Sequence, residues 1–216
     1  MVAGAIFDMD GLLVDSESVW QKNWQFFANE MGVELPEEFK YEICGSSGEM
    51  MMDILRRYYH TDQPEELHAK CKKKTFEEID KGVPLKEGAK EILEYFHQAG
   101  VKLAVASAAP HERIHKNLMN LGIEKYFDAV VSGSDVENGK PAPDIFLKAA
   151  HELQLDPKDC YVFEDAFNGI KAAHSAGCKP IMIPDLSQPD EYIRSLCVGV
   201  FETLAKAKEE IKEKSS

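Results

Sequence analysis

The sequence predicts an α/β protein, in which helices cover both faces of a parallel β-sheet and an all-helical domain is inserted after the first strand. Three observations support this fold class. Short apolar runs alternate with helical stretches over residues 84–183. Residues 16–31 and 36–81 have a helical periodicity that only short loops interrupt. The 216 residues suffice for a core domain carrying a smaller insertion. We therefore expect a core domain of residues 1–14 and 84–216 and a helical domain of residues 15–83.

The first strand and the inserted helices follow in order from the N-terminus. Residues 3–7 form a short apolar run that ends at acidic residues, which is typical of a buried strand leading into a loop. Apolar side chains at three- and four-residue steps then predict a helix over residues 16–31. The helical pattern continues over residues 36–81 and is interrupted by a loop at residues 45–48.

After residue 84, strands alternate with helices. Strands are expected at residues 101–106, 129–131, 160–163 and 180–183, and helices at residues 88–98, 112–120, 142–153 and 169–176. Parallel strands need a crossover connection, which is usually a helix. The alternation therefore predicts right-handed βαβ units and a parallel sheet.

Composition restricts the partners of the protein. The formal net charge is -13, which argues against a nucleic-acid partner because phosphate backbones are bound by basic faces. Apolar runs stay well short of the ~20 residues of a membrane span, and the five cysteines lack the close spacing of zinc sites. The first residues do not have the pattern of a signal peptide. We expect a cytoplasmic protein that binds neither nucleic acid nor membrane.

Polar residues follow the predicted strands at the edge where parallel sheets bind ligands. They are Asp8, Asp10, Ser107, Glu164 and Asp165, with Lys140 in a nearby loop. Crowded carboxylates raise one another's pKa values unless a cation offsets the repulsion. Oxygen ligands suit Mg²⁺, which typically combines one or two carboxylates with the phosphate oxygens of a substrate. The sequence therefore predicts a magnesium site at this edge.

These residue types are the parts that phosphoryl transfer requires. A carboxylate such as Asp8 can attack phosphorus, and the ammonium of Lys140 can neutralise phosphate charge. Ser107 and the backbone N–H groups after it can donate to the phosphate oxygens. We therefore predict a magnesium-dependent phosphoryl-transfer enzyme that acts on a small phosphorylated metabolite.

Single residues of this set also have structural interpretations. The segment Asp8-Met9-Asp10-Gly11 could be part of a calcium loop or a turn, but a calcium loop needs a third acid before the glycine and a glutamate at its end, and this segment has neither. Ser107 alone is typical of a helix cap, and Lys140 alone is typical of a surface lysine. Their joint position favours a functional site.

Four motifs in chain order resemble those of the haloacid dehalogenase superfamily of phosphotransferases. They are Phe7-Asp8-Met9-Asp10-Gly11, Ala106-Ser107, Gly139-Lys140-Pro141 and Phe163-Glu164-Asp165. The resemblance spans nearly the whole chain and implies a Rossmann-like core. Residues 15–81 resemble the small helical cap of the β-phosphoglucomutase-like subfamily.

The resemblance also implies a role for each residue. Asp8 would form an aspartyl-phosphate, and Asp10 would act first as an acid and then as a base. Magnesium would be held by Asp8, the backbone carbonyl of Asp10, and Asp165, with Glu164 beside them. The phosphoryl group would be held by Ser107, the backbone N–H of Ala108, and Lys140. The cap would close over the site, and because one cap can close one site, we expect a monomer.

The cap loop is expected to select the substrate. It contains Gly45, Ser46, Ser47 and Gly48. We expect hydrolysis of a sugar phosphate or a nucleotide-like phosphate, and several segments resemble phosphatases that act on pseudouridine 5′-phosphate.

Three alternatives differ from hydrolysis. A β-phosphoglucomutase would return the phosphoryl group to a sugar, but Gly48 stands near the position of the cap arginine that such mutases use. Asp10 argues against a dehalogenase, which needs neither a second acid nor a metal. A non-catalytic binding module is also open, although Asp8, Asp10 and Lys140 are all present.

Overall fold

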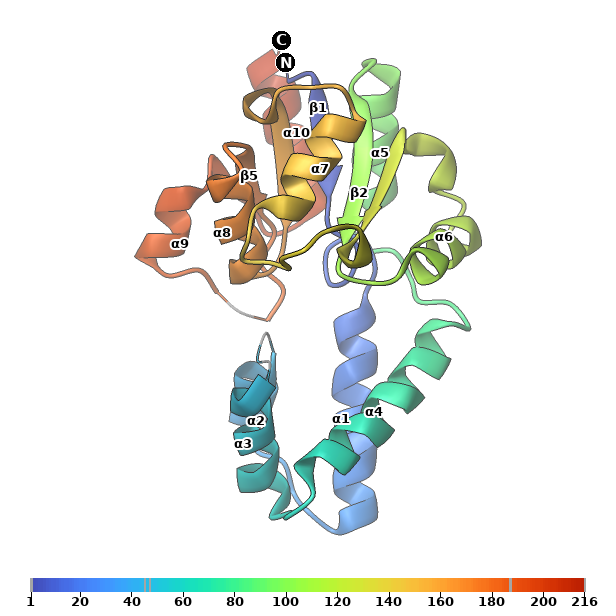
Figure 1. Cartoon of the computed structure of the whole chain (residues 1–216), viewed down its shortest axis with the longest axis vertical. Coiled ribbons are helices and arrows are strands. Elements are labelled where there is room, and N and C mark those ends of the chain that lie inside the picture. Colours follow the sequence, from blue (N-terminus) through green and yellow to red (C-terminus); the bar gives the residue numbers. More distant parts are fainter. Residues whose placement is uncertain (1, 45, 47, 187, 216) are drawn as a thin grey trace. The chain divides into compact units, whose positions relative to one another are not determined.

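The computed structural model describes residues 2–44, 46, 48–186 and 188–215. The chain divides into two compact units (Figure 1). The α/β unit comprises Met1–Asp15 and Pro84–Ser216, and the helical unit comprises Ser16–Val83. None of the helices within the described residues is both long enough and apolar enough to cross a membrane.

The described part of the α/β unit contains a six-stranded sheet in the order β3-β2-β1-β4-β5-β6, and every neighbouring pair is parallel. The strands are β1 (Gly4–Phe7), β2 (Lys102–Ser107), β3 (Ala129–Ser132), β4 (Cys160–Glu164), β5 (Lys179–Met182) and β6 (Gly199–Val200). All four residues of β1 are buried. Because this strand is central and covered on both faces, its sequence is an unbroken apolar run.

Helices cover both faces of this sheet (Figure 1). They are α5 (Ala89–Gln98), α6 (His111–Asn120), α7 (Asp144–Glu152), α8 (Phe167–Ser175), α9 (Glu191–Leu196) and α10 (Leu204–Ser215). On one face, α7 and α8 pack through Phe146 and Ala172 against Ile6. On the other face, Phe96 of α5 packs against the ring of Phe7, and α10 lies beside α5. The fold class predicted from the sequence is therefore confirmed.

The register of the three central strands brings the predicted site residues to one edge. Phe7 of β1 pairs with Val105 of β2 and with Phe163 of β4. The rings of Phe7 and Phe163 are stacked with their centroids 4.6 Å apart. Asp8 and Glu164 come next along the two strands, so their backbones are neighbours at the carboxyl edge of the sheet.

The helical unit has its own core. Its helices are α1 (Ser16–Met31), α2 (Glu37–Ile43), α3 (Gly48–Tyr59) and α4 (Pro64–Ile79). Trp24, Phe39 and Leu55 are buried within it, and the Tyr59 hydroxyl donates to the carbonyl of Trp24 at 2.7 Å. These four helices fall within the predicted helical stretch and show its apolar periodicity.

The two connections between the units run side by side within the α/β unit. The Asp15 N–H donates to the Pro84 carbonyl at 3.1 Å, and the Lys86 N–H donates to the Leu13 carbonyl at 2.9 Å. The pairing is antiparallel. The ammonium of Lys86 lies 3.5 Å from the carboxylate of Asp15 and 2.9 Å from that of Asp185. The segment that leaves the sheet is thus fastened to the segment that returns.

The C-terminal elements are absent from the sequence prediction. Strand β6 has two residues, which is too short to show an alternating pattern. Helix α9 has six residues, and α10 consists largely of lysine, glutamate and alanine. Helix α8 also begins earlier than predicted, at Phe167, so Gly169 lies inside the helix.

Candidate active site

Three charged side chains form a buried network at the carboxyl edge of the sheet. The Lys140 Nζ lies 2.5 Å from Asp8 Oδ1 and 2.6 Å from Glu164 Oε1. Asp8 follows β1, Glu164 ends β4, and Lys140 lies in the loop between β3 and α7. Their side chains are only 10%, 1% and 14% exposed, respectively. Solvent therefore screens these charges weakly, and the network holds the three groups in a fixed arrangement.

Both carboxylate oxygens of Glu164 have protein partners. Oε1 accepts from Lys140, and Oε2 accepts from the backbone N–H groups of Asp165 at 3.1 Å and Ala166 at 3.0 Å. Glu164 thus connects the lysine to the loop that leads into α8.

The Lys140 ammonium also contacts an aromatic ring and a backbone carbonyl. It lies 5.0 Å from the ring centroid of Phe146, which is fully buried, and 3.4 Å from the carbonyl oxygen of Ala106. Although burial disfavours the charged form, Asp8 and Glu164 raise the pKa of Lys140. Lys140 therefore carries its charge across the physiological range.

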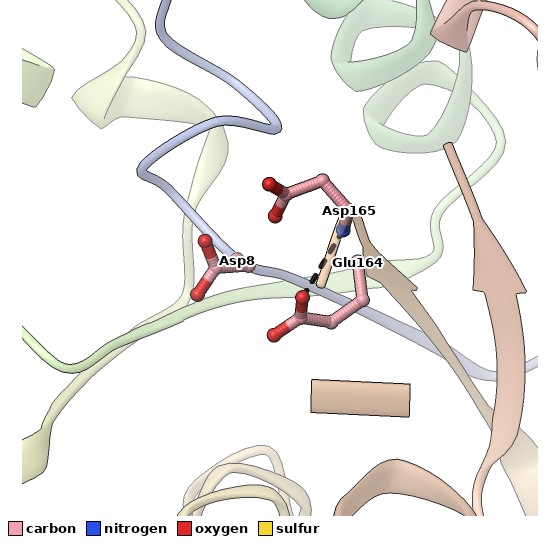
Figure 2. Close-up of side chains that lie close together, drawn as sticks. All are labelled: Asp8, Glu164 and Asp165. Carbon is pink, nitrogen blue, oxygen red and sulfur yellow. Dashed lines mark hydrogen bonds between the residues drawn. The ribbon is translucent and has the colours of Figure 1, made fainter. Parts of the chain in front are cut away.

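Asp8, Glu164 and Asp165 bring their carboxylates together (Figure 2), with one oxygen of each within 4.8 Å of the others. Burial raises the pKa of Asp8 to about 7, since it outweighs the opposing effect of Lys140. Burial and then the charge of Glu164 raise the pKa of Asp165 well above its ordinary value. The single positive charge of Lys140 thus offsets only part of the negative charge that the three carboxylates would carry. A hard divalent cation would complete the compensation, and the all-oxygen donor set fits such an ion.

Asp10 and Ser107 lie together beside this cluster. The Ser107 hydroxyl is 3.4 Å from Asp10 Oδ2 and accepts the backbone N–H of Ala109 at 3.1 Å. Ala108, which lies between Ser107 and Ala109 in the chain, is exposed. The carboxylate of Asp10 is outside the three-carboxylate group, and the family resemblance assigns the metal contact of Asp10 to its backbone carbonyl. That contact, like the phosphate-binding roles of Ser107 and Ala108, stays a prediction.

The structure describes half of the predicted cap loop. Gly45 and Ser47 lie outside the described residues. Ser46 is half-buried, and its hydroxyl donates to the carbonyl of Ile43 at 2.8 Å. Gly48 is the first residue of α3 and has a φ of 57°.

Two glycines make room for the carboxylates, although neither is among the predicted site residues. Gly11 has a φ of 86°, and a Cβ added there would overlap the carboxylate of Asp165. A Cβ added to Gly169 would overlap the carboxylate of Glu164. Glycine inside a helix is unfavourable compared with alanine. The position of Gly169 inside α8 is therefore the signal from which its role could be inferred.

Gly169→Ala is expected to lower the rate of turnover at least about tenfold, because a misplaced catalytic group typically costs this much or more. The added methyl group would displace the Glu164 carboxylate, and Lys140 with it. Steady-state kinetics measure the effect, with Ser175→Ala, an exposed change on the same helix, as the control. Unchanged kinetics in Gly169→Ala would show that the position of Glu164 does not matter.

The fold and this constellation of residues place the protein in a known class. The sequence profile of the haloacid dehalogenase-like hydrolases matches residues 5–183. The chain therefore belongs to the haloacid dehalogenase-like hydrolase family, as the motif resemblance predicts.

Among curated proteins, the chain is similar to enzymes that are named as phosphatases. It is 35% identical over 180 residues to the "Phosphorylated carbohydrates phosphatase" of Thermotoga maritima, covering 82% of each protein. It is 33% identical over 190 residues to the "Probable pseudouridine-5'-phosphatase" of Drosophila melanogaster, covering 85% of this chain and 82% of that protein.

Solved structures show the same fold. A haloacid dehalogenase family hydrolase of Deinococcus radiodurans, crystallised with bound phosphate and sodium, has a TM-score of 0.81 and 26% identity, covering 98% of this chain and 96% of the other. A β-phosphoglucomutase of Clostridium difficile has a TM-score of 0.72 and 24% identity, covering 99% of this chain and 97% of the other. At this identity, the second likeness concerns the fold alone, a Rossmann-like core with a helical cap.

Proposed function

We propose that the protein is a magnesium-dependent phosphatase that hydrolyses a small phosphomonoester through an aspartyl-phosphate on Asp8. The observation that carries the proposal is the buried network of Asp8, Lys140 and Glu164 beside the carboxylate of Asp165. Membership of the hydrolase family and the phosphatase names of the relatives support a phosphoric monoester hydrolase.

The proposed reaction has two steps, and both use Asp8 and Asp10. In the first, a carboxylate oxygen of Asp8 forms a bond to phosphorus, the bond to the ester oxygen breaks, and protonated Asp10 gives its proton to that oxygen. In the second, Asp10 takes a proton from water as the water oxygen bonds to phosphorus. The bond to Asp8 then breaks, and inorganic phosphate leaves.

Magnesium would be held by Asp8, Asp165 and the backbone carbonyl of Asp10. When bound, the ion would supply positive charge that stabilises the transferring phosphoryl group and keeps Asp8 ionised. Glu164 is better suited to positioning Lys140, since both of its oxygens already accept hydrogen bonds from the protein. Lys140 and Ser107 would bind phosphate oxygens.

We propose a sugar phosphate or a nucleotide-like phosphate as the substrate, which agrees with the names of the two relatives. Residues 1–14 and 84–216 would form the catalytic domain, and residues 15–83 the cap that selects the substrate. A monomeric state and a cytoplasmic location stay predictions.

The test is phosphate release from a panel of phosphorylated metabolites, with Mg²⁺ and with a chelator. The panel includes β-glucose 1-phosphate, with glucose 6-phosphate assayed in parallel. Magnesium-dependent phosphate release would support the phosphatase. Formation of glucose 6-phosphate with little free phosphate would identify a mutase instead. The absence of both phosphate release and glucose 6-phosphate over the whole panel would count against both the phosphatase and the mutase.

Magnesium is expected to raise the melting temperature of the wild type, because an ion that binds only the folded state stabilises it by about 2.7 kcal/mol at one hundred times its dissociation constant. Asp165→Asn should lose most of this shift. Differential scanning fluorimetry with Mg²⁺ or Na⁺ at equal ionic strength measures it, with Asp185→Asn as a control outside the cluster. An equal shift in Asp165→Asn would remove Asp165 from the metal site.

A further inference from the structure

A short turn after β3 contacts the loop that follows β2. The two strands are parallel neighbours (Figure 1), and Ser107, the last residue of β2, pairs in register with Ser132, the last residue of β3. Gly133–Asp135 then form a single 3₁₀ turn. Residues 132–135 are named the β3 turn, and residues 107–110 the β2 loop. Ser107 is a predicted phosphate-binding residue, whereas the β3 turn contains none of the predicted site residues.

The Ser132 hydroxyl bonds directly to the β2 loop. Ser132 is fully buried, and its Oγ donates to the carbonyl oxygen of Ala109 at 2.7 Å. The same Oγ accepts the backbone N–H of Ser134 at 3.1 Å and lies 2.6 Å from the Ser134 hydroxyl. The N–H of Ala109 in turn donates to Ser107 Oγ at 3.1 Å. Ala109 is thus held on both sides, by a serine of β2 and by a serine of β3.

The backbone of Gly133 lies against that of Ala108. A Cβ added to Gly133 would come within 3.0 Å of the Ala108 carbonyl oxygen and 3.1 Å of the Ala108 Cα. Contacts this short require the neighbour to move by a few tenths of an ångström. Ala108 is the residue whose N–H is predicted to bind the phosphoryl group. Glycine at position 133 therefore allows the β3 turn to approach the β2 loop closely at this residue.

Asp135 joins the β3 turn to the start of α6. Its carboxylate accepts the backbone N–H of Ser132 at 2.9 Å and lies 2.8 Å from His111 Nε2. The hydrogen bond from Ser132, and then that from His111, lower the pKa of Asp135, so this carboxylate is ionised at neutral pH. His111 is the first residue of α6 and directly follows the β2 loop. The β3 turn therefore holds the β2 loop in its middle, through Ser132, and just beyond its end, through Asp135.

We propose that Ser132 and Gly133 are positioning residues, which fix the β2 loop so that the Ser107 hydroxyl and the Ala108 N–H meet the transferring phosphoryl group. This role rests on the proposed phosphatase function. Donors that stabilise a transition state act best when they stand in place beforehand, because they then need no rearrangement during the reaction. Loops are more mobile than the strands they connect. The hydrogen bonds and the close packing of the β3 turn limit this mobility.

The test is steady-state kinetics on the best substrate of the panel. Ser132→Ala should lower kcat/KM at least about tenfold, the scale of a misplaced catalytic group. Most of the loss should fall on kcat, since these donors act on charge that develops in the transition state. Ser132→Thr, which retains the hydroxyl, should recover most of the loss. The matched control is Ser195→Ala on α9, because this exposed hydroxyl also donates to a backbone carbonyl, that of Tyr192 at 2.6 Å. Equal losses in Ser132→Ala and Ser132→Thr would contradict a role of the hydroxyl.

Gly133→Ala tests the same role without deleting a hydrogen bond, and it covers the case in which Ser132→Ala fails to fold. The added methyl group should displace Ala108 and lower kcat several-fold, while circular dichroism confirms that the variant is folded. Wild-type kcat in both variants, or in Gly133→Ala if Ser132→Ala does not fold, would overturn the inference and leave the phosphatase function intact.

Anion binding separates the inference from the proposed function. Orthovanadate imitates the phosphoryl group in its transition state, and its titration in the presence of Mg²⁺ by isothermal calorimetry needs no turnover. It should bind the wild type and Ser195→Ala equally, and Ser132→Ala and Gly133→Ala more weakly. Weaker binding in these two variants, with no phosphate release from any ester by the wild type, would support the positioning role and contradict the phosphatase. Equal binding by the wild type and both variants, or no binding by the wild type, would contradict the positioning role.

Discussion

Phosphate release by the Asp8→Asn variant is expected to fall by at least about 10⁴-fold, the scale seen when a catalytic nucleophile or its partner is removed. An amide cannot form the acyl-phosphate, yet it fills nearly the same volume as the carboxylate. The Lys140 ammonium should remain paired with Glu164. The measurement is single-turnover phosphate release, with trapping by beryllium fluoride as a second readout of the Asp8 carboxylate.

The stability of the same variant should not decrease at pH 8 in the absence of metal. The folded-state pKa of Asp8 is about 7, above its usual 3.8. Ionisation of this group therefore costs stability as the pH rises from 4 to 7, and asparagine removes that cost. Asp128→Asn serves as a control, because Asp128 accepts a backbone N–H of β2 at the opposite edge; it should remain fully active. An active Asp8→Asn variant would refute the covalent mechanism.

Lys140→Met is expected to abolish detectable turnover and to lower the free energy of unfolding at pH 7.5 by about 3–5 kcal/mol, the cost of leaving buried charges without their partner. Methionine retains the length and the apolar stem of the side chain. The carboxylates of Asp8 and Glu164 then face each other with no cation between them. Urea unfolding in a magnesium-free buffer measures the loss.

The pH dependence of this loss has a definite sign. Without Lys140, the pKa of Asp8 should rise further above its unfolded value. Stability is then lost as the pH rises through the folded-state pKa and regained as it falls toward 5. The double variant Lys140→Met with Glu164→Gln should recover part of the loss. Lys148→Met, which breaks an exposed pair with Glu152, should cost at most about 1 kcal/mol. A similar small cost for Lys140→Met would show that the network is effectively solvated.

The sheet and the positions of the acids could be predicted because strong local signals coincide with a topological rule. The apolar runs before Asp8 and Glu164 are buried strands, and parallel strands present their carboxyl ends at one edge. The arrangement of the charges is harder to predict. Lys140 is linked to Asp8 across 132 positions of the chain, and only the fold determines whether it meets one carboxylate or two.

The elements that the sequence does not reveal are those without a periodic signal. Strand β6 is held by its pairing with β5 rather than by its composition. The need for glycine at position 169 is evident only from the structure, because it depends on how close the carboxylate of Glu164 lies to α8.

The hydrogen-bonded pairing of residues 13–15 with residues 84–86 bears on how such a protein can diversify. The two paired segments resemble the strands of a hairpin, and the helical unit takes the place of the loop that would join them. Because its two ends are held as neighbours, exchanging that unit need not alter the strand order or the spacing of the charges at the sheet edge. Under the proposed function, chemistry and substrate choice would be encoded in separable stretches of the chain, and one could vary while the other stays fixed.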